Sequence, residues 1–165
     1  MIGVIHKNRG YMKYLIYLVV TISFLYQSCA SSGPAFQSVI IDHETNPVIY
    51  IYRPNSVCLM SAKQQFLIDD NLITLRNNEY SFVSVKQGSH KVISGEFKNL
   101  HIPPLITEIN TVRGKSYYIK YDISCDSKYL LDSPKFNIHL AEVNETMALE
   151  ELSQTHLTNI QMQKR

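Results

Sequence analysis

The sequence predicts a mainly β protein: an antiparallel β-sandwich of about seven or eight strands, closed by one C-terminal α-helix and preceded by an N-terminal signal helix. Short apolar segments recur along the chain, several alternate apolar and polar residues with a period of two, and turn-forming residues separate them. Period-two alternation is typical of strands with one buried face. Many short strands of this kind, joined by turns, favour a sandwich.

Strands are predicted where β-branched and aromatic residues gather between turn signals. These segments are 48–52, 66–68, 72–75, 80–85, 90–97, 105–112, 117–123 and 136–140. Asp69-Asp70-Asn71 is typical of a hairpin loop and Asn77-Asn78 of the next turn. Gly88 is expected to adopt a positive φ. A further short edge strand is predicted at 39–41.

The closing helix is predicted to begin after Asn144, a good N-cap, with Glu145 at the positive end of the helix dipole. Glu150 and Glu151 are expected to point away from the sheet. The stripe that packs against the sheet is expected to consist of Ala148, Leu149, Leu152 and His156.

The N-terminus has the anatomy of an export signal. A basic start is followed by an apolar run of about 13 residues, Tyr14–Tyr26, which suits a secretory signal and is short for a bilayer span. Small residues then surround Cys29, where a lipoprotein peptidase would cut. The basic residues of the start are Lys7, Arg9 and Lys13, and translation could begin at Met1 or at Met12.

The segment before Cys29 resembles the short box that ends bacterial lipoprotein signals. Leu25 and Ser28 fit this box, whereas Tyr26 and Gln27 depart from it. The prediction is that Cys29 becomes the acylated first residue, because several acyl chains would hold the domain on a membrane. An ordinary secretory signal or an uncleaved anchor are the alternatives.

Domain boundaries follow from this signal and from the composition. We predict a signal peptide at 1–28, a lipidated tether at 29–46, a β-sandwich with its helix at 47–157 and a polar tail at 158–165. Hydrophobic residues make up 45% of the 165-residue chain and charged residues 18%, which favours a packed core. The net charge of +2 gives no basic face for nucleic acid.

Two further cysteines, Cys58 and Cys125, remain if Cys29 carries lipid. An exported protein lies in an oxidising compartment, where the two could form a disulfide. The bridge also needs Cα atoms about 4.4–6.8 Å apart, which spacing in the sequence does not define. A disulfide and two buried thiols are therefore both open.

Several short motifs follow one another in a recognisable order. They are Tyr-Ile-Tyr-Arg-Pro at 50–54, Ile-Asp-Asp at 68–70, Leu-Arg-Asn-Asn-Glu-Tyr at 75–80, Gln-Gly-Ser-His at 87–90 and Gly-Lys-Ser-Tyr-Tyr at 114–118. Together they resemble a family of short bacterial lipoprotein domains of unknown function, with a prealbumin-like sandwich. Asn78 stands where that family usually has glycine, and Gln87 where it usually has proline. The resemblance implies an envelope lipoprotein without established catalysis.

The sequence lacks three familiar motifs of catalysis and of cofactor binding. The sequence has no Gly-x-Ser-x-Gly, no phosphate loop and no Cys-x-x-Cys. Asp42-His43-Glu44 is interpreted as a solvated linker rather than a metal site, because neighbours on an extended chain point in opposite directions. His90 and His139 fall in predicted strands, His139 on the polar register, and His101 in a loop. We predict no enzyme activity, no metal and no cofactor.

Two residues are candidates for an interaction surface. Arg53 is expected to pair with Asp69 or Asp70, or to stack on an aromatic ring, as a structural contact or as a ligand contact. Tyr118 alternates away from the face of Tyr117 and is therefore expected to be exposed. Exposed tyrosine is typical of interfaces, and filling of an edge strand is the alternative.

These observations predict a membrane-anchored bacterial envelope lipoprotein that acts as a non-catalytic protein-interaction module. Its expected partners are the membrane, through the lipid on Cys29, and another envelope protein. The absence of Asp after Cys29, where Ala30 stands, favours the outer membrane with the domain facing the periplasm. The alternative function is a periplasmic module that binds a small ligand or a glycan.

Overall fold

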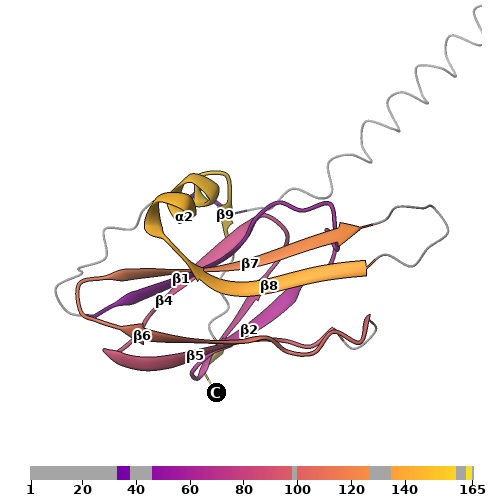
Figure 1. The fold of residues 1–165 in the computed structure, drawn as a ribbon. Coiled ribbons are helices and arrows are strands. Elements are labelled where there is room, and N and C mark those ends of the chain that lie inside the picture. Colours follow the sequence, from indigo (N-terminus) through magenta and orange to yellow (C-terminus); the bar gives the residue numbers. More distant parts are fainter. Residues whose placement is uncertain (1–32, 38–45, 98–99, 127–134, 159–162, 165) are drawn as a thin grey trace, which may run out of the picture. The chain divides into compact units, whose positions relative to one another are not determined.

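The computed structural model describes residues 33–37, 46–97, 100–126, 135–158 and 163–164, all within one compact unit, Ser31–Arg165 (Figure 1). In this part of the chain the predicted mainly β fold with a C-terminal helix is confirmed. The signal helix and the strand predicted at 39–41 lie outside it. The elements are β1 (Val48–Arg53), β2 (Gln64–Ile68), β3 (Asn71–Leu75), β4 (Glu79–Ser84), β5 (Gly88–Ser94), β6 (Ile106–Thr111), β7 (Ser116–Asp126), β8 (Lys135–Val143), α2 (Glu145–Leu152), β9 (His156–Leu157) and β10 (Gln163–Lys164).

The strands form two five-stranded sheets. Sheet A has the order β8-β7-β1-β4-β9, and sheet B has the order β10-β3-β2-β5-β6. Sheet B is antiparallel, as predicted. Sheet A also contains two parallel pairs, β1 with β7 and β4 with β9. Periodicity in a sequence reports which face of a strand is buried and not the direction of its neighbour. The long connection between β1 and β7 gives the chain room to return in parallel.

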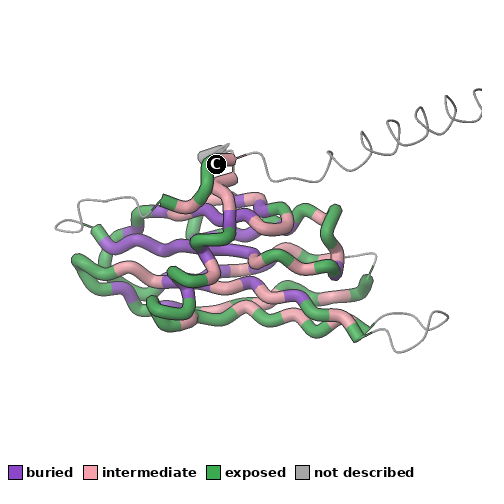
Figure 2. Tube along the Cα trace, turned by 90° about the horizontal axis from the view of Figure 1, so that it is seen from above, coloured by how far each residue is buried: buried purple, intermediate pink, exposed green. Residues whose placement is uncertain are grey.

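Alternate side chains of both sheets form the core between them. In β2, Phe66 and Ile68 are buried while Gln65 and Leu67 face outward. The inner core is made in the same way from Ile49, Ile51, Ile73, Leu75, Val83, Val92, Ile109, Ile119, Tyr121 and Ile123. In Figure 2 one strand is buried along its length, whereas buried and exposed residues alternate along several others. Removing this apolar surface from water is the main driving force for the fold.

A second apolar cluster covers the outer face of sheet A. Its buried members are Val48, Tyr50, Tyr52, Tyr80, Tyr118, Ala148 and Leu152. Both faces of β1 are therefore covered, and all six of its residues are buried. A strand buried on both faces has no need of polar residues at alternate positions, which is why 48–52 is continuously apolar and aromatic.

Helix α2 packs on sheet A and begins where the sequence predicts. The side chain of Asn144 accepts a hydrogen bond from the Met147 backbone N–H at 2.9 Å. The prediction that Leu149 and His156 belong to the stripe that packs on the sheet is wrong. Leu149 is exposed, and His156 lies in β9 beyond the end of the helix. The chain turns after Leu152, whose carbonyl accepts the Thr155 N–H at 2.8 Å, so the helical stripe stops there. No helix in the described residues is long and apolar enough to cross a bilayer.

Residues 33–37 pack on the domain, although the sequence predicted them as part of a tether. The Leu157 N–H donates to the Pro34 carbonyl at 2.8 Å, and the Phe36 N–H donates to Thr155 at 3.1 Å. The Phe36 ring packs edge-on against Tyr80, with ring centroids 5.1 Å apart. This aromatic contact fixes the segment, so the domain begins well before the predicted boundary at 47.

The predicted polar tail also contributes to the domain. The Thr158 N–H donates to the Tyr80 carbonyl at 2.9 Å. Further on, β10 pairs with β3, with Gln163 opposite Leu72. The backbone of a polar segment can add to a sheet edge because ladder hydrogen bonds do not depend on side-chain polarity.

Candidate functional site

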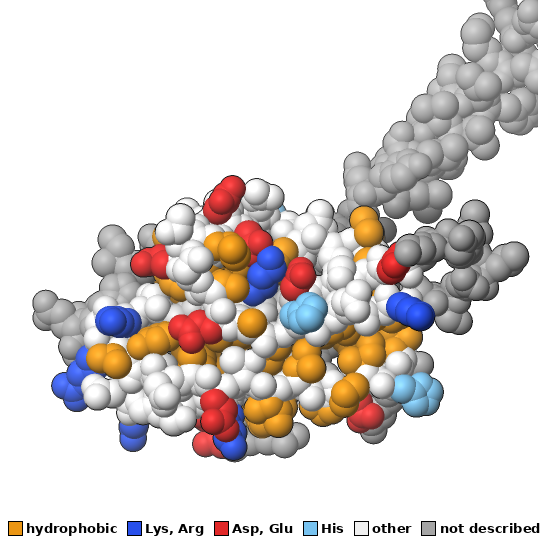
Figure 3. Space-filling model, viewed as in Figure 1, with side chains coloured by type: hydrophobic (Ala, Val, Ile, Leu, Met, Phe, Trp, Pro, Cys, Tyr) orange, Lys and Arg blue, Asp and Glu red, His pale blue; other side chains and the backbone are white. Residues whose placement is uncertain are grey.

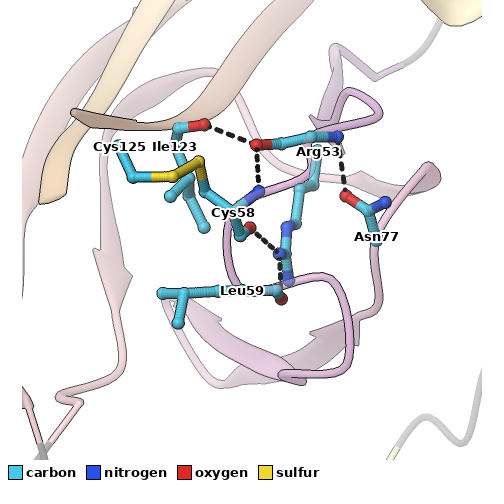
Figure 4. Close-up of a disulfide and its surroundings, with 7 residues drawn as sticks. Arg53, Cys58, Leu59, Asn77, Ile123 and Cys125 are labelled. Carbon is cyan, nitrogen blue, oxygen red and sulfur yellow. Dashed lines mark hydrogen bonds between the residues drawn. A yellow bond between two sulfur atoms is a disulfide. The ribbon is translucent and has the colours of Figure 1, made fainter. Parts of the chain in front are cut away.

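Cys58 and Cys125 are joined by a disulfide, with Cα atoms 5.9 Å apart (Figure 4). Cys58 lies in the connection 54–63, which leads from β1 in sheet A to β2 in sheet B and is called the crossover loop below. Cys125 lies near the end of β7. The bridge therefore ties the crossover loop to sheet A.

Arg53 holds the same loop from inside the protein. One terminal nitrogen of its guanidinium donates to the Ala62 carbonyl at 2.7 Å, and the other donates to the carbonyls of Leu59 at 2.6 Å and Cys58 at 3.4 Å. Burial lowers the pKa of Arg53, and the neighbouring Tyr121 and Glu79 oppose that effect. The planar fork of the guanidinium suits several carbonyls that converge on one point.

Arg53 makes a structural contact, which is one of its two predicted roles, but its predicted partners and its predicted place on the surface are wrong. Its exposed fraction is 0%, and its hydrogen bonds go to loop carbonyls rather than to Asp69 or Asp70. The burial of β1 explains why Arg53 is not on the surface. Both faces of this strand are covered, so the side chain of its last residue is enclosed and binds the loop that follows.

A polar network fixes the start of the crossover loop. The Ser56 N–H donates to the side-chain oxygen of Asn77 at 2.9 Å, and the Ser56 hydroxyl donates to the Ile123 carbonyl at 2.7 Å (Figure 4). The Asn77 amide in turn donates to the Asn55 side chain at 2.7 Å. The β3–β4 turn and β7 are thus connected to the loop by side-chain hydrogen bonds.

The braced crossover loop presents two apolar side chains to solvent. Val57 is 85% exposed and Met60 is 46% exposed. Neither residue is among those predicted to form a site. Their exposure could have been predicted from the sequence, because both are apolar residues inside a segment rich in turn-forming residues. Such side chains find no sheet face to cover.

Tyr118 is buried, which contradicts its predicted place on an interaction surface. It is 5% exposed, and its ring stacks on Tyr50 with centroids 5.3 Å apart. Its hydroxyl donates to Glu145 at 3.2 Å. Burial and the charge of Glu145 together raise the pKa of Tyr118 to about 12. The alternation that placed Tyr118 opposite Tyr117 was right, but α2 covers that second face.

Glu151 was expected to point away from the sheet and instead binds it. Its carboxylate accepts a hydrogen bond from the Tyr52 hydroxyl at 2.6 Å and one from the Lys120 ammonium at 2.5 Å. Burial and this carboxylate raise the pKa of Tyr52. Glu151 therefore fastens α2 to β1 and β7. Neither partner could be paired with it from sequence spacing.

His90 is buried and connects two segments of the chain through its ring nitrogens. Its Nδ1 lies 2.6 Å from an Asp69 carboxylate oxygen, and its Nε2 lies 2.7 Å from the Lys86 carbonyl oxygen. His90 thus ties the β2–β3 hairpin to the connection between β4 and β5.

The other candidate residues are not brought together. His139 is exposed on β8, as expected from its register, and His101 is exposed in the connection between β5 and β6. Among the described residues, no group of three or more His, Cys, Asp and Glu side chains could hold a metal ion. The segment Asp42-His43-Glu44 and the proposed lipidation site Cys29 lie outside the described residues.

The edge between β8 and β6 is the second notable surface. These are edge strands of sheets A and B, and the Thr107 hydroxyl connects them by donating to the Leu140 carbonyl at 2.7 Å. The inward side chains of β8 are only half-buried: Phe136, Ile138 and Leu140. Figure 3 shows apolar side chains gathered in a band between β8 and β6. We call this region the open edge.

Alternate residues of β8 direct their backbone N–H and C=O groups away from β7, toward the open edge. The bond from Thr107 shows that the Leu140 carbonyl points away from β7. In an antiparallel pair, backbone groups alternate in direction along the strand, so those of Phe136 and Ile138 also point away from β7. Within the described part of the chain, no strand pairs with β8 on that side.

No family model matches this sequence, and no curated protein matches it.

Proposed function

We propose that this protein is a membrane-anchored bacterial envelope lipoprotein whose sandwich is a non-catalytic module for binding another envelope protein. The observation that carries the binding role is the open edge, where backbone groups of β8 that no described strand pairs lie beside half-buried apolar side chains. The N-terminal signal with Cys29 carries the anchoring role.

Export to an oxidising compartment has a second line of support. The disulfide between Cys58 and Cys125 joins residues 67 positions apart, and such bridges persist chiefly in proteins outside the cytosol. The structural observation and the signal come from different parts of the chain. Both favour the envelope as the site of action.

The open edge favours binding by strand addition. An exposed sheet edge is a template for an extended segment, whose main chain supplies hydrogen bonds while its side chains fill neighbouring pockets. Phe136 and Ile138 on strand β8 direct backbone groups to this side, whereas the Leu140 carbonyl already accepts from Thr107. The half-buried side chains Phe136 and Ile138 would lose further apolar surface to solvent on binding. We therefore propose that an extended segment of an envelope protein pairs with the β8 edge.

The anchoring role is tested by mass spectrometry of the mature N-terminus. We expect the mature chain to begin at Cys29 and to carry acyl chains, so that it sediments with membranes. The C29S variant should lose the acyl mass and appear in the soluble fraction or stay unprocessed. An unmodified Cys29, or cleavage at another residue, would contradict the proposal.

The binding role is tested by photo-crosslinking in cells. A photoreactive residue placed at His139 on β8 should give a discrete adduct with a protein, whereas the same probe at the exposed Asp70 in the β2–β3 hairpin should not. Adding I138P should abolish the adduct, because proline removes an edge N–H that does not pair with β7. Equal adducts from both probe positions, or an adduct that survives I138P, would argue against strand addition.

A further inference from the structure

Few residues of the sequence separate the proposed anchor from the first described residue. Only residues 30–32 separate Cys29 from Gly33, the first described residue. Four extended residues span at most about 14 Å. Gly33 itself is tightly packed, since a Cβ at this position would lie 1.7 Å from the Leu157 carbonyl oxygen. If Cys29 carries lipid, as proposed above, the domain is held within a short distance of the bilayer.

The point where the chain enters the domain adjoins the crossover loop. His156 contacts the Gly33 carbonyl oxygen through Nδ1 at 3.1 Å, and its own N–H donates to the Asn78 carbonyl at 3.0 Å. The neighbouring residue, Asn77, accepts the Ser56 N–H at 2.9 Å. A short series of hydrogen bonds thus connects Gly33 to the loop that carries Val57.

The surface at this end suits a phospholipid headgroup region. Val57 and Met60 are exposed apolar side chains on a loop that Arg53 and the disulfide hold in place. The charged residues of the crossover loop and of the adjoining turn 76–78 are Lys63 and Arg76, both exposed and both cationic. Cations near a membrane surface are attracted by anionic lipids.

We infer that the crossover loop and the adjoining turn lie against the phospholipid surface, with Val57 and Met60 reaching into the headgroup region. This inference rests on the proposed lipid anchor at Cys29. Two aliphatic side chains bind a membrane weakly alone. The anchor raises their effective concentration at the surface, which converts a weak contact into an orienting one.

The opposite end of the sandwich offers a control position for the proposed membrane contact. The loop 112–115 lies at the opposite end of β1, where the Val48 N–H donates to the Lys115 carbonyl at 3.2 Å. Val112 in that loop is exposed. It is therefore a matched control for Val57: the same residue type, exposed, at the other end of the sandwich.

The test uses tryptophan, which is absent from the 165-residue chain. The acylated mature variants V57W and V112W would be reconstituted into vesicles of phosphatidylethanolamine and phosphatidylglycerol, with and without phospholipids that carry brominated acyl chains. The expected result is a blue-shifted emission and several-fold stronger quenching by the brominated lipids for V57W than for V112W. Adding M60D to V57W should reduce that quenching.

Three outcomes separate the inference from the proposal on which it rests. Equal quenching of V57W and V112W in protein with acylated Cys29 would overturn the inference and leave the anchor intact. Stronger quenching of V112W would place the opposite end at the membrane and would also overturn it. Absence of acyl chains in the mass spectrum of the reconstituted protein would instead contradict the proposed anchor.

Discussion

Arg53 is a buried cation whose positive charge is compensated by backbone carbonyls. Its guanidinium donates to Ala62, Leu59 and Cys58, all in the crossover loop. The carbonyls have no equivalent donor if the side chain is lost, and an unsatisfied buried polar group costs about 1–3 kcal/mol. The conformation of the loop is therefore coupled to one side chain at the end of β1.

We predict that R53M lowers the free energy of unfolding by about 2–4 kcal/mol, because methionine fills part of the volume but donates no hydrogen bond. Urea unfolding of the isolated protein measures the change. R76M is the matched control, since Arg76 is exposed, and it should change stability by less than about 0.5 kcal/mol. Similar losses for both variants would show that Arg53 does not hold the loop.

Helix α2 is attached to sheet A by packing and by one carboxylate. Ala148 and Leu152 are buried against the sheet, while Glu151 accepts hydrogen bonds from Tyr52 on β1 and Lys120 on β7. The helix has eight residues, and an isolated helix of this length is unstable in water. Its stability therefore depends on these contacts with the sheet.

The E151A variant should lose about 1–2 kcal/mol of unfolding free energy, because the Tyr52 hydroxyl and the Lys120 ammonium lose their shared acceptor. Denaturant unfolding, followed by far-ultraviolet circular dichroism, reports this loss. E150A removes a carboxylate from the adjacent, exposed position of the same helix and should be nearly neutral. An equal effect of E150A would mean that only helix propensity had changed.

The crossover loop is braced at its middle by the disulfide to β7. The bridge closes a loop between residues 67 positions apart, so reduction should give the unfolded chain considerably more freedom. The native contacts of Arg53 and Ser56 do not involve the sulfur atoms. The loop should therefore keep its place in the folded protein when the bridge is removed.

We expect C58A/C125A to fold and to be less stable by about 2–4 kcal/mol, in line with a bridge that closes a long loop. Urea unfolding of the wild type with and without reductant should show the same difference. A mobility shift on reduction in a denaturing gel would report the bridge directly. Identical stability of oxidised and reduced protein would contradict its structural role.

At the scale of the whole molecule, sheet A separates two cores. Tyr121 points into the inner core, where burial raises its pKa to about 12 although Arg53 opposes the shift. Tyr118 points into the outer cluster, where burial and Glu145 raise its pKa to about 12 as well. The two faces of β7 thus bury tyrosines that must stay neutral for both layers to remain packed.

This arrangement predicts alkaline unfolding. An unfolded tyrosine ionises near pH 10, so above that pH the unfolded chain binds fewer protons than the folded one. Stability from these groups is complete below pH 10 and is lost as the pH rises through about 12. Ultraviolet titration should show tyrosines that ionise together with loss of structure, and urea-unfolded protein is the control. Full ionisation of a still-folded protein near pH 10 would contradict the burial.

Several local features were predictable because their causes are local. Asn78 and Gly88 adopt positive φ values of 61° and 145°, as their residue types suggest. Asn144 caps α2 because its short side chain can accept a hydrogen bond from the backbone of the first turn. The alternation in 117–123 correctly placed Tyr117 and Tyr118 on opposite faces of the strand. Each of these properties depends on a residue and its immediate neighbours.

By itself, the sequence determined the mainly β class, the turns, the start of the helix and the signal-like N-terminus. Only the tertiary structure decided that Arg53 and Tyr118 are buried, because both faces of β1 are covered and because helix α2, which lies further along the chain, covers the outer face of β7. It also decided the parallel pairing of β1 with β7 and the pairing of Cys58 with Cys125. Periodicity reports that a strand has two faces, whereas long-range packing decides what covers each face.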